Sequence, residues 1–243
     1  MSFKKLAGCL VLGAFALGII GCEDEERAAL FDAQECINNI NENLSQTEIT
    51  TAANACEAKL NGASSSEAEA IRCSAKLIAG GLTTSRFVDA FKAMDEGQGS
   101  KEAKLMVLLS FTGTDAMVNA RSMFNACQKS GVPGLVFVAG VSLSGTSISS
   151  IYGSGTCGKT PTNPNDTLCD GQEVENILNQ CKADSSQCNT QDIGNSAIAI
   201  SDAYCLGDNA DKDICKDIGT AITNAGGDPA TIGAQLLNLL DKN

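Results

Sequence analysis

The chain has 243 residues, a formal net charge of −12 and neither histidine nor tryptophan. Its excess of carboxylates excludes a general electrostatic attraction to nucleic acid, so we expect no nucleic-acid partner. Without histidine the chain cannot form a Ser-His or Cys-His nucleophile, and it cannot attach a c-type haem through Cys-x-x-Cys-His.

The first 22 residues have the features of an export signal. Lys4 and Lys5 precede an apolar run, Leu6 to Ile20, and a small residue, Gly21, precedes Cys22. A basic start, a short apolar segment and a small residue before the cut are typical of a secretory signal peptide. The run is shorter than the roughly 20 residues that a transmembrane helix needs. We therefore expect residues 1–21 to be removed, which would change the formal net charge from −12 to −14.

The sequence Ile19-Ile20-Gly21-Cys22 resembles the lipobox of bacterial lipoproteins, and this resemblance covers residues 1–22 only. It implies that the Cys22 thiol receives a diacylglycerol, that cleavage falls between Gly21 and Cys22, and that the freed amine is acylated as well. The membrane is then a partner through the lipid anchor at Cys22, since more than one acyl chain makes anchoring stable. Cys9 fits the same pattern, but too little apolar chain precedes it.

The cysteines that follow the signal predict a disulfide framework. An even number of cysteines in an exported chain indicates disulfides, and the sequence contains no Cys-x-x-Cys pair that would suit zinc, an iron–sulfur cluster or thioredoxin-like chemistry. Four precede and six follow a cysteine-free stretch, residues 128–156, so each half can close its own bridges, with the pairing left open. The predicted disulfide cysteines are Cys36, Cys56, Cys73, Cys127, Cys157, Cys169, Cys181, Cys188, Cys205 and Cys215.

Apolar residues at three-four spacing predict helices through the N-terminal half. A first helix extends to Leu44, and capping-box spacing predicts that Ser45 with Glu48 and Ser64 with Glu67 open the next two. Thr83 or Thr84 caps a fourth. The run from Lys101 to Phe111 is apolar on most sides and predicts the buried central helix. A further helix begins at Asp115 and ends before Gly131 and Pro133.

The C-terminal half is also predicted to be helical. Residues 132–151 are apolar and rich in Gly and Ser, which favours a buried helix, with a strand at 135–138 as the alternative. Residues 152–171 form a loop pinned by Cys157 and Cys169. Helices follow at about 172–183, 191–206 and 211–225, and Asp228 with Pro229 opens the last one.

These elements predict an all-α, disulfide-stabilised helical bundle, either as one unit or as two helical subdomains. The expected organisation is a cleaved signal at 1–21, a helical subdomain with four cysteines at 22–131, the connecting segment at 132–156 and a helical subdomain with six cysteines at 157–243.

Two acidic loops are candidate calcium sites. One contains Asn163, Asn165, Asp166 and Asp170, and the other contains Asp208, Asp211 and Asp213. Neither matches the spacing of a known calcium loop, so we interpret these residues as turn formers and helix caps. We expect no metal and no other cofactor.

The chain is thus expected to be a membrane-anchored lipoprotein that acts as a non-catalytic binding or scaffolding module. We place it on the bacterial outer membrane or cell surface, in contact with an unknown protein or extracellular ligand. The alternative is a periplasm-facing accessory lipoprotein of an envelope transport or assembly machine. A carboxylate- or calcium-dependent hydrolase is a third, less favoured interpretation, because the usual catalytic residues are missing.

Overall fold

A computed structural model describes residues 24–94, 101–112, 115–150, 171–184 and 188–240. Within these ranges the chain forms α-helices and one short 3-10 helix, η3 (Gly207–Asn209), and no strand. The expected all-α class is therefore confirmed for this part of the chain. The α-helices are α1 (Asp24–Asn38), α2 (Gln46–Ala58), α3 (Ser66–Ala79), α4 (Thr84–Met94), α5 (Lys101–Leu108), α6 (Ala116–Ser130), α7 (Pro133–Ser149), α8 (Gly171–Ala183), α9 (Thr190–Ala203), α10 (Asp213–Ala225) and α11 (Pro229–Leu239).

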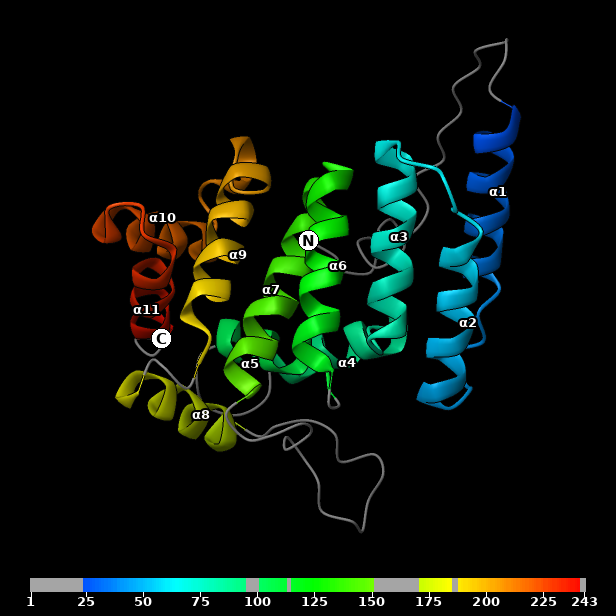
Figure 1. Cartoon of the computed structure of the whole chain (residues 1–243). Helices are drawn as coiled ribbons and strands as arrows, with labels where there is room; N and C mark the ends of the chain where they lie inside the picture. Colours follow the sequence, from blue (N-terminus) through cyan, green and yellow to red (C-terminus); the bar gives the residue numbers. More distant parts are fainter. Residues whose placement is uncertain (1–23, 95–100, 113–114, 151–170, 185–187, 241–243) are drawn as a thin grey trace.

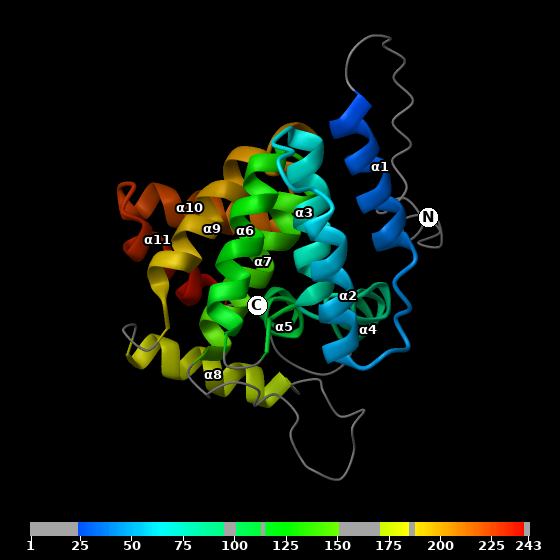
Figure 2. The same ribbon diagram turned by 45° about the vertical axis from the view of Figure 1, so that its right-hand side comes forward.

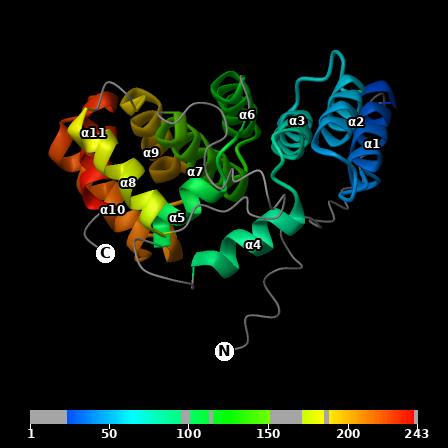
Figure 3. The same ribbon diagram turned by 90° about the horizontal axis from the view of Figure 1, so that it is seen from below.

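Helices stand side by side in one row, in the order α1, α2, α3, α6, α7, α9 and α11, and neighbours in the row are antiparallel (Figure 1). Helices α4, α5 and α8 lie across one end of this row, at the bottom of Figures 1 and 2, and Figure 3 shows them in front of it. We call that end the lower edge. The opposite end, which carries the start of α1, is the upper edge.

Hydrogen bonds between distant segments fix the first helices at both edges. At the upper edge, a carboxylate oxygen of Glu26 in α1 accepts from the backbone N–H of Ser65, at 3.3 Å, just before α3. At the lower edge, the Glu42 carboxylate accepts from the backbone N–H groups of Thr84 and Ser85, at 3.1 and 3.3 Å. Glu42 thus satisfies free donors at the start of α4, where the helix dipole also favours a negative charge.

Among the described residues, the buried apolar side chains form two clusters. The smaller one joins α1, α2 and α3. The larger one extends from Cys73 to Leu240 and includes residues of both halves of the chain. The apolar contacts of the described residues therefore continue across the expected boundaries at 131 and 157, and the division into two subdomains stays a prediction.

Helix α7 lies inside the row, and every residue from Ala139 to Ile148 is buried. The expected buried helix is confirmed over this stretch, and the strand alternative at 135–138 is wrong. Its small residues explain the burial. A Cβ atom at Gly145 would lie 1.7 Å from the carbonyl oxygen of Met106, and one at Gly140 would lie 2.7 Å from Cδ1 of Ile200. Neighbouring helices approach α7 closely because no side chain intervenes at these positions.

The expectation that Lys101–Phe111 forms the central helix is wrong. The segment holds a shorter helix, α5, at the lower edge, and α7 occupies the centre (Figure 1). Residues 106–111 are nevertheless buried, because this segment packs against α7. The carbonyl oxygens of Leu108 and Ser110, at the end of α5, accept from the Arg86 guanidinium, at 3.1 and 2.8 Å. Burial lowers the pKa of Arg86.

The capping predictions have different outcomes. The Ser45–Glu48 box is confirmed: the Ser45 hydroxyl accepts from the Glu48 N–H, and the Glu48 carboxylate accepts from the Ser45 N–H at 2.9 Å. The hydrogen bonds from Ser45 lower the pKa of Glu48. The Ser64–Glu67 box is wrong, because Ser65 is the N-cap of α3 and accepts from the N–H of Ala68.

Two other helix ends show the same contrast. Helix α1 ends at Asn38 rather than at Leu44, since the Asn41 side chain accepts from the N–H of Asn43 and stabilises a turn there. Asp228 caps α11 as expected and accepts from the N–H of Thr231 at 2.8 Å. Hydrogen bonds from Thr231 lower the pKa of Asp228.

Four disulfides are present among the described residues: Cys36–Cys56, Cys73–Cys127, Cys181–Cys188 and Cys205–Cys215. Each stays within one half of the chain, as the cysteine counts predict. The first joins α1 to α2, and the second joins α3 to α6. Cys157 and Cys169, with the loop that they are expected to pin, lie outside the described residues. No helix in the described ranges has the length and hydrophobicity to cross a membrane.

Gly145 should be the least replaceable glycine of α7. Gly145→Ala should lower the free energy of unfolding by about 1–3 kcal/mol or more, because the new Cβ would overlap the backbone of Met106. Gly134→Ala, in the same helix, is the matched control, since nothing lies within 4 Å of a Cβ there. Urea denaturation of both variants measures the difference between their free energies of unfolding. Equal stabilities would show that α5 and α7 are not packed this closely.

Candidate functional site

A groove of about 390 Å³ lies between α6 and α9, and we call it the α6–α9 groove. Both helices pack on α7, from opposite sides of it (Figure 3), so α7 forms the floor. Leu143 of α7 lies on this floor, together with Phe124 of α6 and Ala199 of α9. These three residues are only 1 %, 4 % and 7 % exposed, so the floor is apolar and belongs to the packed core.

Polar side chains form the rim of the groove. On α6 they are Arg121, Asn125 and Gln128, one or two turns apart on one face of the helix. On α9 they are Asp192, Asn195 and Asp202. Asparagine and glutamine side chains both donate and accept hydrogen bonds. The groove therefore offers a small apolar floor between two rows of hydrogen-bonding groups, and polar or charged residues are the majority of the described residues that line it.

An ion pair joins the two rims of the groove. Nε of Arg121 donates to Oδ2 of Asp192 at 2.8 Å. The Asp192 side chain is 13 % exposed and that of Arg121 is 47 % exposed, so the aspartate is the buried partner. Asp192 lies in the first turn of α9, where the Asn189 side chain accepts from its N–H at 3.3 Å. The start of α9 is thus fixed by a cap and by a contact with α6.

The contact between α7 and α9 continues beyond the groove. The rings of Phe137 and Tyr204 stack with their centroids 4.3 Å apart. Gly140 lies against Ile200, and Gly194 of α9 lies against the backbone of Pro229 at the start of α11. The second rim is therefore held from both sides, by α7 and by α11.

The chemistry available in the groove is binding by hydrogen bonds and apolar contact. None of the ten described residues that line it carries a hydroxyl, a thiol or an amine. Its two carboxylates, Asp192 and Asp202, stand ten positions apart on α9, which is about 15 Å along a helix axis. The carboxylate pairs of glycosidases are about 5–10 Å apart. The groove geometry therefore favours a contact site over a carboxylate pair that acts on one bond.

The predicted lipidation site cannot be placed, because Gly21 and Cys22 lie outside the described residues. The same holds for the first acidic loop, with Asn163, Asn165, Asp166 and Asp170.

The second acidic loop is described, and Asp208, Asp211 and Asp213 are all exposed. Burial, together with the charges of Glu102 and Asp213, raises the pKa of nearby Asp217. No group of three or more potential metal ligands forms within the described ranges.

Comparison with protein-family models, with curated proteins and with solved structures finds no match to this chain. The groove therefore has to be interpreted from its own residues. Sequence reasoning missed it, although Arg121, Asn125 and Gln128 carry a signal in their helical spacing. The spacing of these residues on α6 does not show that α9 lies opposite them across α7, so the site could not be recognised from the sequence.

The Arg121–Asp192 pair should stabilise the fold modestly. A double-mutant cycle with Arg121→Ala and Asp192→Asn should give a coupling energy of about 0.2–1 kcal/mol, since solvent screens the half-exposed arginine. Chemical denaturation of the four proteins measures it. Lys216 and Asp213, 3.8 Å apart and both exposed, form the control pair, with a coupling near zero. A coupling at Arg121–Asp192 no larger than in the control would show that the pair does not hold the rims together.

Proposed function

We propose that this chain is an exported, lipid-anchored lipoprotein that acts as a non-catalytic binding module and contacts its partner through the α6–α9 groove. The observation that carries the binding role is the groove itself, with an apolar floor, polar rims and fixed supporting helices. Its partner is an unknown protein or extracellular ligand, and the membrane is contacted through the lipid on Cys22.

The disulfides support export. Cys36–Cys56, Cys73–Cys127, Cys181–Cys188 and Cys205–Cys215 indicate an oxidising compartment outside the cytoplasm, because thiols stay reduced in the cytosol of most organisms. The basic start, the apolar run and the lipobox at residues 1–22 agree with that location.

The rigidity of the groove supports binding. The disulfide Cys73–Cys127 fixes α6 to α3, and the Arg121–Asp192 pair adds a weaker link between α6 and α9. A site whose walls are already in place loses little conformational entropy when a partner binds. Because the sequence also lacks histidine, the commonest general base is not available to this chain.

Removing the lipid acceptor tests the anchor. Cys22→Ala should leave an unacylated precursor that contains residues 1–21, because the thiol that takes the lipid is missing. Metabolic labelling with a fatty acid and the size of the protein on a gel measure this. Normal acylation of Cys22→Ala would contradict the lipoprotein assignment.

Protease treatment of intact cells separates the two locations. Digestion of the wild-type protein would support exposure on the surface, and protection until lysis would support the periplasm-facing alternative. A protease-cleavable loop tag inserted near Asn163 is the control, since the disulfides alone can slow digestion of an exposed protein.

Filling the groove tests the contact surface. A photoreactive residue at Gln128 should give one defined adduct in cells, and the added substitution Asn195→Phe should abolish it by occupying the groove. Asn54→Phe, at an exposed asparagine of α2, is the matched control and should leave the adduct unchanged. An adduct that persists in Asn195→Phe would show that the groove is not the contact site.

A further inference from the structure

We propose that Asn61 is a site of spontaneous deamidation, and that Arg72 slows the reaction by holding the turn in which Asn61 lies. The backbone nitrogen of Gly62 is the nucleophile, and the side-chain nitrogen of Asn61 leaves as ammonia. This inference does not depend on the proposed binding function. It assigns a covalent modification to the segment between α2 and α3, residues 59–65, which we call the α2–α3 turn.

The reaction needs an asparagine whose following backbone nitrogen is unobstructed. Asn61-Gly62 is the only Asn-Gly pair in the sequence. Glycine has no Cβ atom, so its nitrogen can approach the preceding side chain more closely than the nitrogen of any other residue. The sequence thus singles out Asn61 among the asparagines of this chain.

Asn61 and Gly62 form the tip of the α2–α3 turn, and both are exposed. The carbonyl oxygen of Leu60 accepts from the N–H of Ala63 at 3.0 Å, which closes a β-turn over the two residues. Gly62 has a φ of +85°, and nothing lies within 4 Å of the place where a Cβ atom would be. Within the described part of the chain, nothing accepts a hydrogen bond from the Gly62 N–H. The nucleophile is therefore accessible and not engaged.

Other exposed asparagines lack this freedom because a helix holds the nitrogen that follows them. Asn54 in α2 and Asn125 in α6 are exposed, and each is followed by alanine. Inside an α-helix each backbone N–H donates to the carbonyl oxygen four residues earlier, which holds the nitrogens of Ala55 and Ala126 in the helix. These asparagines are therefore expected to react much more slowly than Asn61.

The reaction needs no reagent except water. The Gly62 nitrogen forms a bond to Cγ of Asn61, and the bond from Cγ to the side-chain nitrogen breaks. The proton of the Gly62 N–H ends on the departing ammonia, and a five-membered succinimide ring remains. Water then opens the ring. Cleavage of the bond from Cγ to the ring nitrogen leaves aspartate, whereas cleavage of the bond from the backbone carbonyl carbon leaves iso-aspartate, whose main chain continues through Cγ.

Arg72 of α3 restricts the motion that ring closure requires. Its Nη2 donates to the carbonyl oxygen of Leu60 at 2.9 Å and also to that of Ala63, so one guanidinium holds both ends of the turn. Glu69 accepts from Nη1 of Arg72 at 2.8 Å and orients the guanidinium. Ring closure has to rotate the peptide unit at the tip of the turn, and fixed ends oppose that rotation. The rate of deamidation therefore depends on Arg72.

Conversion to iso-aspartate weakens the same turn. It inserts one methylene group into the main chain between the two carbonyl groups that Arg72 binds, so the guanidinium can no longer hold both in the native geometry. Either product also adds a carboxylate to residues 59–65, which contain none. The contact between α2 and α3 is therefore expected to loosen as the protein ages.

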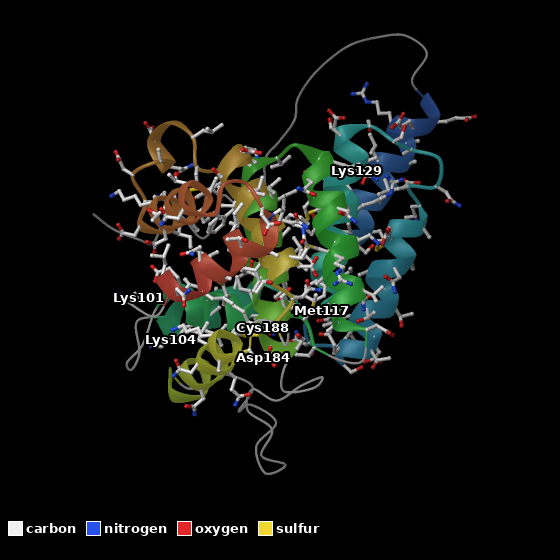
Figure 4. The ribbon with its side chains drawn as sticks, turned by 60° about the vertical axis from the view of Figure 1, so that its left-hand side comes forward. Lys101, Lys104, Met117, Lys129, Asp184 and Cys188 are labelled. Atoms are coloured by element: carbon white, nitrogen blue, oxygen red, sulfur yellow. A yellow bond between two sulfur atoms is a disulfide. The ribbon has the colours of Figure 1, made fainter. Side chains whose placement is uncertain are left out.

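Incubation of the purified protein in heavy-oxygen water tests the site, because opening of the ring places a heavy oxygen atom on the deamidated residue. Trypsin then releases residues 60–72 as one peptide, in which Asn61 is the only carboxamide side chain. The control peptide, residues 122–129, contains Asn125 and ends at Lys129, which Figure 4 labels near the same edge of the row. Mass spectrometry with fragmentation measures the heavy oxygen on each asparagine.

We expect heavy oxygen to enter at Asn61 of the folded protein several-fold faster than at Asn125, with iso-aspartate as the main product. Asn61→Gln should remove this labelling, because closure of the larger ring is much slower. Equal labelling of the two asparagines, or unchanged labelling of the peptide in Asn61→Gln, would overturn the assignment of the site.

Arg72→Lys tests the control of the rate, since one ammonium group cannot reproduce the fixed fork of a guanidinium. It keeps the trypsin site and should raise the labelling rate of Asn61 several-fold. Lys76→Gln is the matched control, because it removes an ion pair of 2.9 Å with Glu57 from the same helix without touching the turn. Circular dichroism establishes that both variants fold, and Glu69→Gln replaces Arg72→Lys if the latter does not. A rate no higher than that of Lys76→Gln would show that Arg72 does not protect the turn.

Discussion

The close packing of α7 against its neighbours is the constraint on which the rest of the structure depends. Gly145 lets the backbone of Met106 approach α7, and Gly140 makes room for Ile200. Because α7 can be surrounded in this way, it joins the helices before it to the helices after it in one apolar cluster. The floor of the α6–α9 groove is part of this helix. A bulkier residue at Gly140 would press against Ile200 of α9 and so move the rim that α9 supplies.

Much of the fold could be predicted from sequence, since its signals are local. The Ser45–Glu48 box and the Asp228 cap act within four residues, and both are formed as expected. The predicted start of α3 is wrong because a distant residue takes part: Glu26 of α1 accepts from Ser65, the residue that caps α3. The predicted central helix is wrong for a related reason. Lys101–Phe111 is apolar on most sides, but α7 is the more hydrophobic segment, and its small residues let other helices surround it.

The groove could not be predicted in the same way. Its rims come from two helices about 70 positions apart in the chain, for example Arg121 and Asp192, and nothing in the sequence shows that both flank α7. The disulfides were easier to predict, since an even cysteine count in each half limits the possible pairings from the sequence alone. The acidic residues that the sequence singles out, such as Asp208 and Asp211, are exposed, which agrees with their interpretation as turn formers.

The distribution of disulfides along the row has a mechanical consequence. Cys36–Cys56 joins α1 to α2 and Cys73–Cys127 joins α3 to α6, but none of the described disulfides joins α2 to α3. The α2–α3 contact instead uses non-covalent links such as the ion pair between Lys76 and Glu57, at 2.9 Å. A force that pulls on the N-terminal end would thus load this interface first. The α1–α2 hairpin would separate as a unit, while the bridge between α3 and α6 keeps the remaining row closed.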